Sequence, residues 1–177
     1  RCSRDWSSDV CSSDLAMAVG VPILQLVLFG YAINTDPKGL PTAVVKVTTT
    51  MDKIPDAERA SRKKLAERLP SLDTGEHGKS FTLWHTPSQG QFYMEPGIVV
   101  ARAFAPSGDV VPSELPAGRA VHYLLIGPYD ELPGAWGRFF EWCAKENLAL
   151  TGVNWQVYDS YDADSSKIET SLYALLA

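Results

Sequence analysis

Cysteine is scarce in this chain. Three cysteines occur in 177 residues, and two of them, Cys2 and Cys11, lie close to the N-terminal end. Cys143 is therefore the single thiol of the remaining chain, which excludes a disulfide framework of the kind that small secreted domains use. A lone thiol suits a reducing compartment, so we expect a cytoplasmic protein.

The residue patterns of common metal and enzyme sites are also missing. The histidines His77, His85 and His122 show no metal-ligand spacing with one another or with acidic residues. The sequence has no Gly-x-Ser-x-Gly nucleophile elbow, no glycine-rich phosphate loop and no paired-carboxylate motif. We therefore expect no metal and no cofactor, and a binding protein is favoured over an enzyme.

Positive charge is not in excess. Lys and Arg number 16 against 21 Asp and Glu, which gives a net charge of −5 and argues against nucleic acid as the partner. One basic cluster on a predicted helix is interpreted as a solvated face: Arg59, Arg62, Lys63, Lys64 and Arg68. No helix-turn-helix segment is recognisable, so we expect a free-standing module without a DNA-binding part.

Only one long apolar run occurs, over residues 16–33. Its length is at the lower bound for a membrane helix, and Tyr31 lies where an interfacial aromatic residue would. The string from Val21 to Val45 resembles the first transmembrane helix of ATP-binding-cassette exporter permeases, but no further membrane span follows. Residues 16–43 are interpreted either as a foreign permease fragment or as a genuine helix that tethers a sensor to the membrane.

The first 15 residues do not resemble a protein segment. The stretch from Asp9 to Leu15 can be back-translated into a DNA string that resembles a sequencing-library adapter. This resemblance favours an artefactual, chimeric junction over a genuine tether. The predicted parts are therefore an adapter-like stretch (1–15), a permease-like helix and linker (16–43) and a globular domain (44–177), and membrane association follows only if the helix is genuine.

Strand and helix signals alternate from about Val44 onward. β-branched residues predict a strand over residues 44–50, and Pro55 opens a helix that runs to about Leu69. Two further strands are predicted over residues 81–85 and 97–104. Residues 106–118 are rich in proline and glycine and are predicted to form an extended connection.

The second half of this region repeats the same order. A strand is predicted over residues 120–126, followed by a helix that is capped at or near Asp130 and that Asn147 ends. Two strands follow, over residues 155–161 and 168–176. Two strand–helix–strand–strand units predict an α+β fold with pseudo-twofold symmetry and with its helices on one face of an antiparallel sheet.

Several segments resemble the GyrI-like effector-binding domain, the small-molecule sensor of some AraC-type and MerR-type regulators. They are LPAGR (Leu115–Arg119), GPYDELPGAWGRFFEW (Gly127–Trp142), NWQVY (Asn154–Tyr158) and the strand–loop–strand Ser80–Phe104. The resemblance covers residues 44–177 and implies a ligand cleft near the pseudo-twofold axis, lined by aromatic side chains and often an acidic group. It further implies a hydrophobic or amphipathic ligand, cations included, and sets a precedent for a protein partner.

Aromatic side chains on or beside the predicted strands and helix are the candidate ligand-binding residues. Their faces bind flat hydrophobic or cationic ligands through buried area and ring electrostatics. The candidates are Trp84, Tyr93, Tyr123, Tyr129, Trp136, Trp155, Tyr158 and Tyr173. Aromatic residues at helical spacing are more often core, so Phe139, Phe140 and Trp142 are interpreted as structural.

The acidic group is where this chain departs from the family pattern. Multidrug-sensing members carry a Glu in the last strand, within a Thr-Glu-Leu-Tyr motif, whereas this chain has Ser171 at that position. Glu169 faces the same side of a regular strand and is either a replacement or a solvated edge residue. Glu95 is the other candidate, and its alternative is a loop carboxylate beside a turn. Loss of the usual Glu weakens the expectation of a cationic ligand.

A small-molecule hydrolase of the same fold is the alternative function. Some proteins that resemble this family hydrolyse strained electrophiles with a pocket Glu and Tyr. A buried Glu can act as a general base when burial raises its pKa, so Glu95 and Glu169 are the candidate catalytic residues. This alternative requires a pocket closed around one of these carboxylates beside a Tyr hydroxyl.

Overall fold

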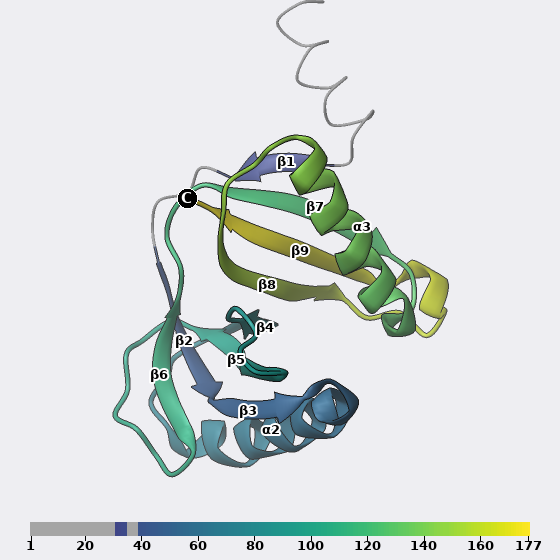
Figure 1. Cartoon of the computed structure of the whole chain (residues 1–177). Helices are drawn as coiled ribbons and strands as arrows, with labels where there is room; N and C mark the ends of the chain where they lie inside the picture. Colours follow the sequence, from purple (N-terminus) through teal and green to yellow (C-terminus); the bar gives the residue numbers. More distant parts are fainter. Residues whose placement is uncertain (1–30, 35–38) are drawn as a thin grey trace, which may run out of the picture. The chain divides into compact units, whose positions relative to one another are not determined.

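The computed structural model describes residues 31–34 and 39–177 (Figure 1). Residues 33–177 form one compact unit, whose fold is described below. The adapter-like stretch and most of the predicted membrane helix lie outside the described residues, so their assignment stays a prediction.

The end of the predicted membrane helix is a strand. Residues 31–33 belong to β1 (Tyr31–Asn34), which corrects the helical expectation for this part of the apolar run. No helix within residues 31–34 and 39–177 is long and apolar enough to cross a membrane.

An antiparallel sheet forms the framework of the domain. Its strands follow the order β1-β7-β9-β8-β4-β5-β2-β6, and β3 pairs with β5 beside this path. β4 (His77–Trp84) and β8 (Leu150–Ser160) are paired in the middle of the order, with Phe81 opposite Val157. The two predicted repeats therefore meet at this central strand pair, one on each side of it (Figure 1).

The predicted strand over residues 44–50 is two strands. β2 (Leu40–Val45) and β3 (Val47–Thr50) both pair with β5 (Gln91–Val100) and are separated by Lys46. Ala43 in β2 is completely buried. The predicted domain boundary at residue 44 therefore falls inside a strand of the fold.

The interior of β5 corrects a second prediction. The strand was expected to begin at Gly97, but it begins at Gln91 and includes the supposed turn Glu95-Pro96-Gly97. Pairing with β3 ends at Met94 and pairing with β2 begins at Gly97, so Pro96 lies in the gap between the two partners. A missing N–H is tolerated where no strand-to-strand hydrogen bond is required.

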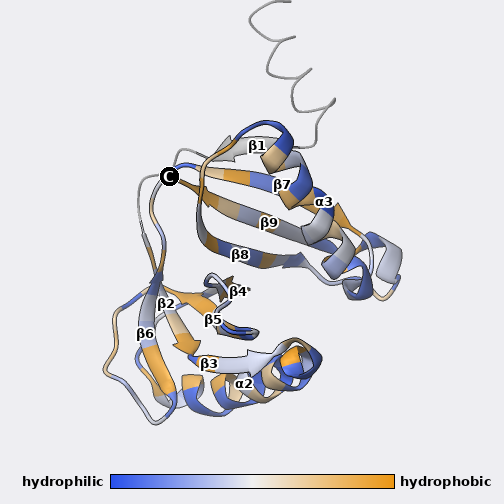
Figure 2. Cartoon of the chain, viewed as in Figure 1, coloured by the Kyte–Doolittle hydropathy of each residue, from blue (hydrophilic) through white to orange (hydrophobic). Residues whose placement is uncertain are grey.

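The first helix has nearly the predicted bounds. α2 (Ile54–Arg68) follows η1 (Met51–Lys53) and leads into η2 (Leu69–Ser71), and Pro55 occupies its first turn. Proline suits this position because its fixed φ matches the helix and its missing N–H needs no partner there. Hydrophilic and hydrophobic residues alternate along α2 in Figure 2, which is typical of a helix with one packed face.

A strand was missed in the connection between the halves. β6 (Val110–Leu115) pairs with β2, with Pro112 opposite Ala43. Since β6 is the last strand in the order, its outer side has no strand neighbour among the described residues. An edge strand tolerates proline, which is why a proline-rich segment predicted as a connection forms a strand.

The second half follows the predicted order. β7 (Ala120–Ile126) has the predicted bounds, and α3 (Leu132–Lys145) follows η3 (Tyr129–Glu131). The residue before α3 is Glu131, next to the expected cap, and it makes no side-chain capping bond. After β8, η4 (Ser165–Lys167) leads into β9 (Glu169–Leu176).

Both helices lie on the same face of the sheet, as predicted. Tyr158 of β8 hydrogen-bonds to Glu58 of α2, and the neighbouring same-face residue Gln156 accepts a hydrogen bond from Trp136 of α3. A core on this face consists of Ala43, Val45, Leu65, Leu69, Val100 and Val110. Because side chains alternate along a strand, a second core occupies the opposite face: Val44, Phe81, Leu83, Leu115, Ala120 and Trp155.

Candidate functional site

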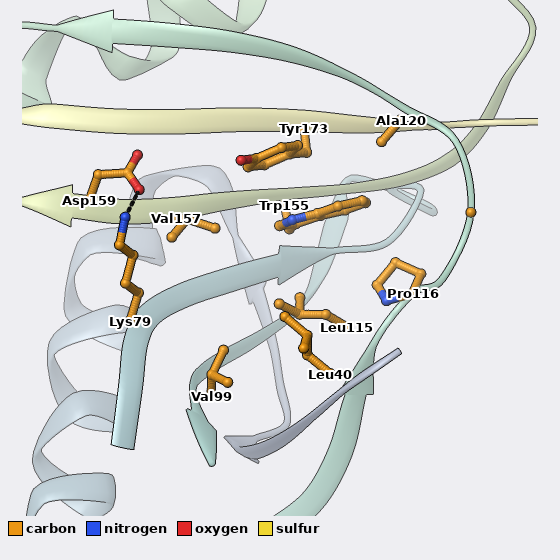
Figure 3. Close-up of a pocket in the computed structure, with 11 residues that line it drawn as sticks. Leu40, Lys79, Val99, Leu115, Pro116, Ala120, Trp155, Val157, Asp159 and Tyr173 are labelled. Carbon is orange, nitrogen blue, oxygen red and sulfur yellow. Dashed lines mark hydrogen bonds and ion pairs between the residues drawn. The ribbon is translucent and has the colours of Figure 1, made fainter. Parts of the chain in front are cut away.

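A cavity lies on the sheet face opposite the helices. Its volume is ≈ 350 Å³, within the range of small-molecule sites. It is lined by Leu40, Lys79, Val99, Leu115, Pro116, Gly118, Ala120, Trp155, Val157, Asp159 and Tyr173 (Figure 3). Residues from both halves of the sheet therefore contribute to one site.

Two stacked rings form one wall of this cavity. Trp155 of β8 lies directly opposite Tyr173 of β9, and their rings are nearly parallel, with centroids 5.1 Å apart and an interplanar angle of 8°. His122 of β7 continues the row, with its ring 4.7 Å from that of Tyr173. Burial raises the pKa of Tyr173 and lowers that of His122, so both rings favour their neutral forms.

The facing wall is aliphatic. Val99 comes from β5 and Leu40 from β2, while Leu115 ends β6 and Pro116 begins the connection to β7. These side chains face the Trp155 side of the cavity in Figure 3. The segment predicted to form an extended connection thus supplies part of the cavity lining.

The cavity has one charged end. Lys79 Nζ of β4 donates to Asp159 Oδ1 of β8 over 2.6 Å, and this hydrogen bond raises the pKa of Lys79. The Lys79 side chain is 59% exposed, whereas that of Asp159 is only 15% exposed. Asp159 Oδ2 is buried and has no hydrogen-bond partner among the described residues.

The ten predicted ligand-binding residues divide between the two faces. Trp155 and Tyr173 line the cavity. Tyr93, Glu95 and Glu169 lie on the cavity side of their strands but outside its lining. Trp84, Tyr123, Tyr129, Trp136 and Tyr158 lie on the helix side, where Tyr123 stacks on Phe139 of α3, and Tyr129 packs edge-on against Tyr158. The cavity therefore gathers only two of the ten.

Glu95 is buried, not a loop carboxylate. It is 3% exposed and accepts a hydrogen bond from Ser113 Oγ at 3.0 Å. His85 Nε2 lies 3.3 Å from its Oε1, and Lys46 Nζ lies 3.6 Å from the same oxygen. The ring of Tyr93 packs beside that of His85. A charged carboxylate needs such partners when it leaves water.

Glu169 has the opposite environment. It is exposed at the first position of β9, opposite Ile126 of β7 and Ser160 of β8. Ser171, two residues later, is buried and hydrogen-bonded to His122 over 2.9 Å. Glu169 thus does not bring a buried carboxylate to the position where the family pattern has one.

A polar network connects the helices to the sheet. Glu58 Oε1 of α2 accepts hydrogen bonds from Arg62, from Thr82 Oγ1 at 2.8 Å and from the Tyr158 hydroxyl at 3.2 Å. The Arg62 guanidinium lies 5.0 Å from the centroid of the Tyr158 ring. Burial is the main cause that raises the pKa of Tyr158. The candidate Tyr158 is therefore part of the contact between α2 and the central strands.

The prediction of a solvated cluster is wrong for one of its members, Arg62. Arg62 donates to the backbone carbonyls of Phe81 and Gly97 over 2.7 and 2.8 Å, and only 27% of its side chain is exposed. Arg59 and Lys63 are exposed on the same helix, as expected. Helical periodicity alone does not reveal that a long basic side chain reaches backbone carbonyls of a sheet.

Sequence reasoning missed both charged residues of the cavity. Asp159 follows Trp155 and Val157 at two-residue spacing, and strand periodicity places all three on one face. That signal could have identified Asp159 once Trp155 was a candidate. Lys79 lies before the predicted strand over residues 81–85, whereas β4 begins at His77 and includes it.

Comparisons with known proteins place this fold in a family. A model of the GyrI-like small-molecule binding domain matches residues 32–176. The EcmrR–DNA complex aligns with a TM-score of 0.70 at 16% identity, over 92% of this chain and 65% of that chain, so this chain spans just under two thirds of it. The isolated EcmrR C-terminal domain gives 0.65 at 19% identity, over 83% and 96%.

Two further structures have the same fold. SAV2435 bound to tetraphenylphosphonium gives a TM-score of 0.65 at 12% identity, over 83% of this chain and 93% of that one. A hydrolase from Listeria innocua gives 0.53 at 12% identity, over 83% and 91%. At these identities the likeness shows the fold alone. A search of the curated proteins gives no match.

The family match covers both halves of the sheet and both helices. It includes the segments on which the resemblance rested, and it begins before the predicted domain start at residue 44. No comparison supports a permease relationship for residues 16–43 or a chimeric origin for the chain. The chain belongs to the GyrI-like family of small-molecule binding domains.

Proposed function

We propose that the cavity beside Trp155 and Tyr173 is the ligand site of this domain and that it takes a hydrophobic or amphipathic small molecule. The observation that carries the proposal is the stacked aromatic wall facing an aliphatic wall within a cavity of ≈ 350 Å³. Such a slot buries a flat apolar ligand on both sides, and burial of apolar area is the dominant favourable contribution to such binding.

The related structures support a binding role. SAV2435 is bound to a bulky aromatic cation. EcmrR is bound to DNA, and its chain is longer than the part that this chain matches. We assign to this domain the ligand-sensing part of such a system, in a reducing compartment such as the cytoplasm. A protein partner that responds to the occupied domain is compatible with this role, and nucleic acid is not assigned to the cavity.

Calorimetric titration with tetraphenylphosphonium and with an uncharged triaryl compound tests the site. Trp155→Leu and Tyr173→Leu should each weaken binding by roughly tenfold, about 1.4 kcal/mol, because each removes one ring of the stacked wall. Phe140→Leu is the matched control, since it changes a partly exposed ring on α3, on the other face of the sheet. Circular dichroism checks that each variant is folded.

Two results would contradict the proposal. One is the failure of every aromatic probe to bind the unchanged protein. The other is binding that survives both cavity substitutions and is lost in Phe140→Leu, because that pattern would move the site to the helix face.

A hydrolase is the second candidate, and the burial of Glu95 is the observation that favours it. A buried carboxylate beside Ser113 and His85 has the residue types of general-base chemistry. However, Glu95 does not line the cavity, and the groups that contact it are not Tyr hydroxyls. Turnover of an epoxide by the unchanged protein and its loss in Glu95→Gln would support this function; equal rates would remove Glu95 from it.

A further inference from the structure

Lys79 and Asp159 give the cavity an end of zero net charge. Among the described residues that line the cavity, they are the two that carry full charges, and they are in contact through a 2.6 Å hydrogen bond. The remaining lining is apolar apart from the Tyr173 hydroxyl, the Trp155 indole N–H and backbone groups. A ligand therefore meets a cation and an anion side by side instead of a single uncompensated charge (Figure 3).

We propose that this ion pair selects ligands whose polar end is uncharged or zwitterionic, and that it removes any preference for a net cation or a net anion. The inference rests on the cavity being the ligand site. A lone buried carboxylate would attract a cation strongly, because Coulomb energies rise as the surroundings become less polar. With Lys79 in contact with Asp159, the attraction of a ligand cation by the carboxylate and its repulsion by the ammonium largely cancel.

The nearby titratable groups do not disturb this balance. Glu169 is the smallest of the influences that raise the pKa of Lys79, and it is exposed outside the lining, where water and salt screen its charge. His122 is held neutral because burial lowers its pKa. Asp159 Oδ2, which is buried without a partner, is an acceptor that a ligand N–H or O–H can satisfy, while Lys79 remains a donor for a ligand acceptor.

A pair of probes with the same shape and opposite charge tests the proposal. Tetraphenylphosphonium and tetraphenylborate are titrated calorimetrically against the full chain. The two dissociation constants should agree within about threefold for the unchanged protein. Lys79→Met should shift the ratio of the two dissociation constants at least tenfold in favour of the cation. Asp159→Asn should shift it at least tenfold in favour of the anion. The double variant should return the ratio to that of the unchanged protein.

The control uses an ion pair of equal length elsewhere. Lys64 of α2 contacts Asp109 over 2.6 Å, outside the cavity, so Lys64→Met changes the net charge by the same unit and should leave the ratio unchanged. A Lys79→Met protein with an unchanged ratio, or an unchanged protein that prefers the cation more than tenfold, would overturn the charge inference alone. Failure of both probes to bind any variant would overturn the ligand site and the inference with it.

Discussion

In the first half of the sheet, β5 places Gly97 opposite Phe81 of β4, whereas in the second half β9 places Tyr173 opposite Trp155 of β8. The strands pair in the same order on both sides of the central pair. A Cβ at Gly97 would lie 2.7 Å from Phe81 Cζ, so the first half is closed by one ring against bare backbone. The second half has two rings in this place, and they form the wall of a cavity.

The next positions differ in the same way. Glu95 lies opposite Leu83 in the first half, and Ser171 lies opposite Val157 in the second. The carboxylate in the first half is buried among its own partners, while the small hydroxyl in the second is hydrogen-bonded to His122, whose ring stacks on Tyr173. The strand pairing determines which positions face each other, and the side chains at those positions determine which half supplies the aromatic wall of the cavity.

The largest expected effect concerns the helix packing of the two halves. Phe139→Ala in α3 should lower the free energy of unfolding by about 4 kcal/mol, because this fully buried ring packs against other aromatic rings. Leu65→Ala in α2 should cost less, about 2.5 kcal/mol, since α2 is held partly by the Arg62 network. Urea unfolding measures both, and equal losses would show that the halves are packed alike.

A smaller effect is expected from closing the space at Gly97. Gly97→Ala should lower the free energy of unfolding by about 2–3 kcal/mol, because Phe81, Val44 and the Ala43 carbonyl all lie within 2.8 Å of the added carbon. Gly137→Ala in α3 is the control: nothing lies within 4 Å of its added carbon, so it should stabilise the helix by about 0.5–1 kcal/mol. A neutral Gly97→Ala would mean that the first half is not tightly closed.

The smallest expected effect is a pH dependence in the second half. Burial lowers the pKa of His122 in the folded protein below its ordinary value of 6.5, so the unfolded chain takes up the proton first. The contribution of His122 to stability is therefore present above about pH 6.5 and is lost as the pH falls through its folded pKa. His122→Gln should reduce the loss of unfolding free energy, measured with urea, between pH 7 and pH 5. An unchanged loss would assign this pH dependence to other groups.

The elements that the sequence predicted well are those with strong local signals. β7 has the predicted bounds, and α2 differs by one residue at each end, because Pro55 and Pro70 mark its limits. β6 and the first part of β5 were missed since proline and glycine favour turns locally. The edge position of β6 and the gap between β2 and β3 make those residues acceptable in strands, and both are properties of the assembled sheet.

The candidate site was predictable only in part. Trp155 and Tyr173 were identified, but five other aromatic candidates lie on the helix side. Alternation along a strand separates residues into two sets without showing which set meets the helices. The contact between Lys79 and Asp159 joins residues far apart in the sequence, and its position depends on β4 pairing with β8.

The position of Trp155 has a practical consequence. Indole emission depends on the polarity and stacking of its surroundings, and this indole lies in the cavity wall in contact with a phenol ring. Trp84, Trp136 and Trp142 of α3 belong to the helix side of the sheet, so a ligand in the cavity is expected to leave their emission as a constant background. Under the proposed function, Trp155 is therefore an optical reporter of cavity occupancy, and libraries of unlabelled compounds can be screened against the domain directly.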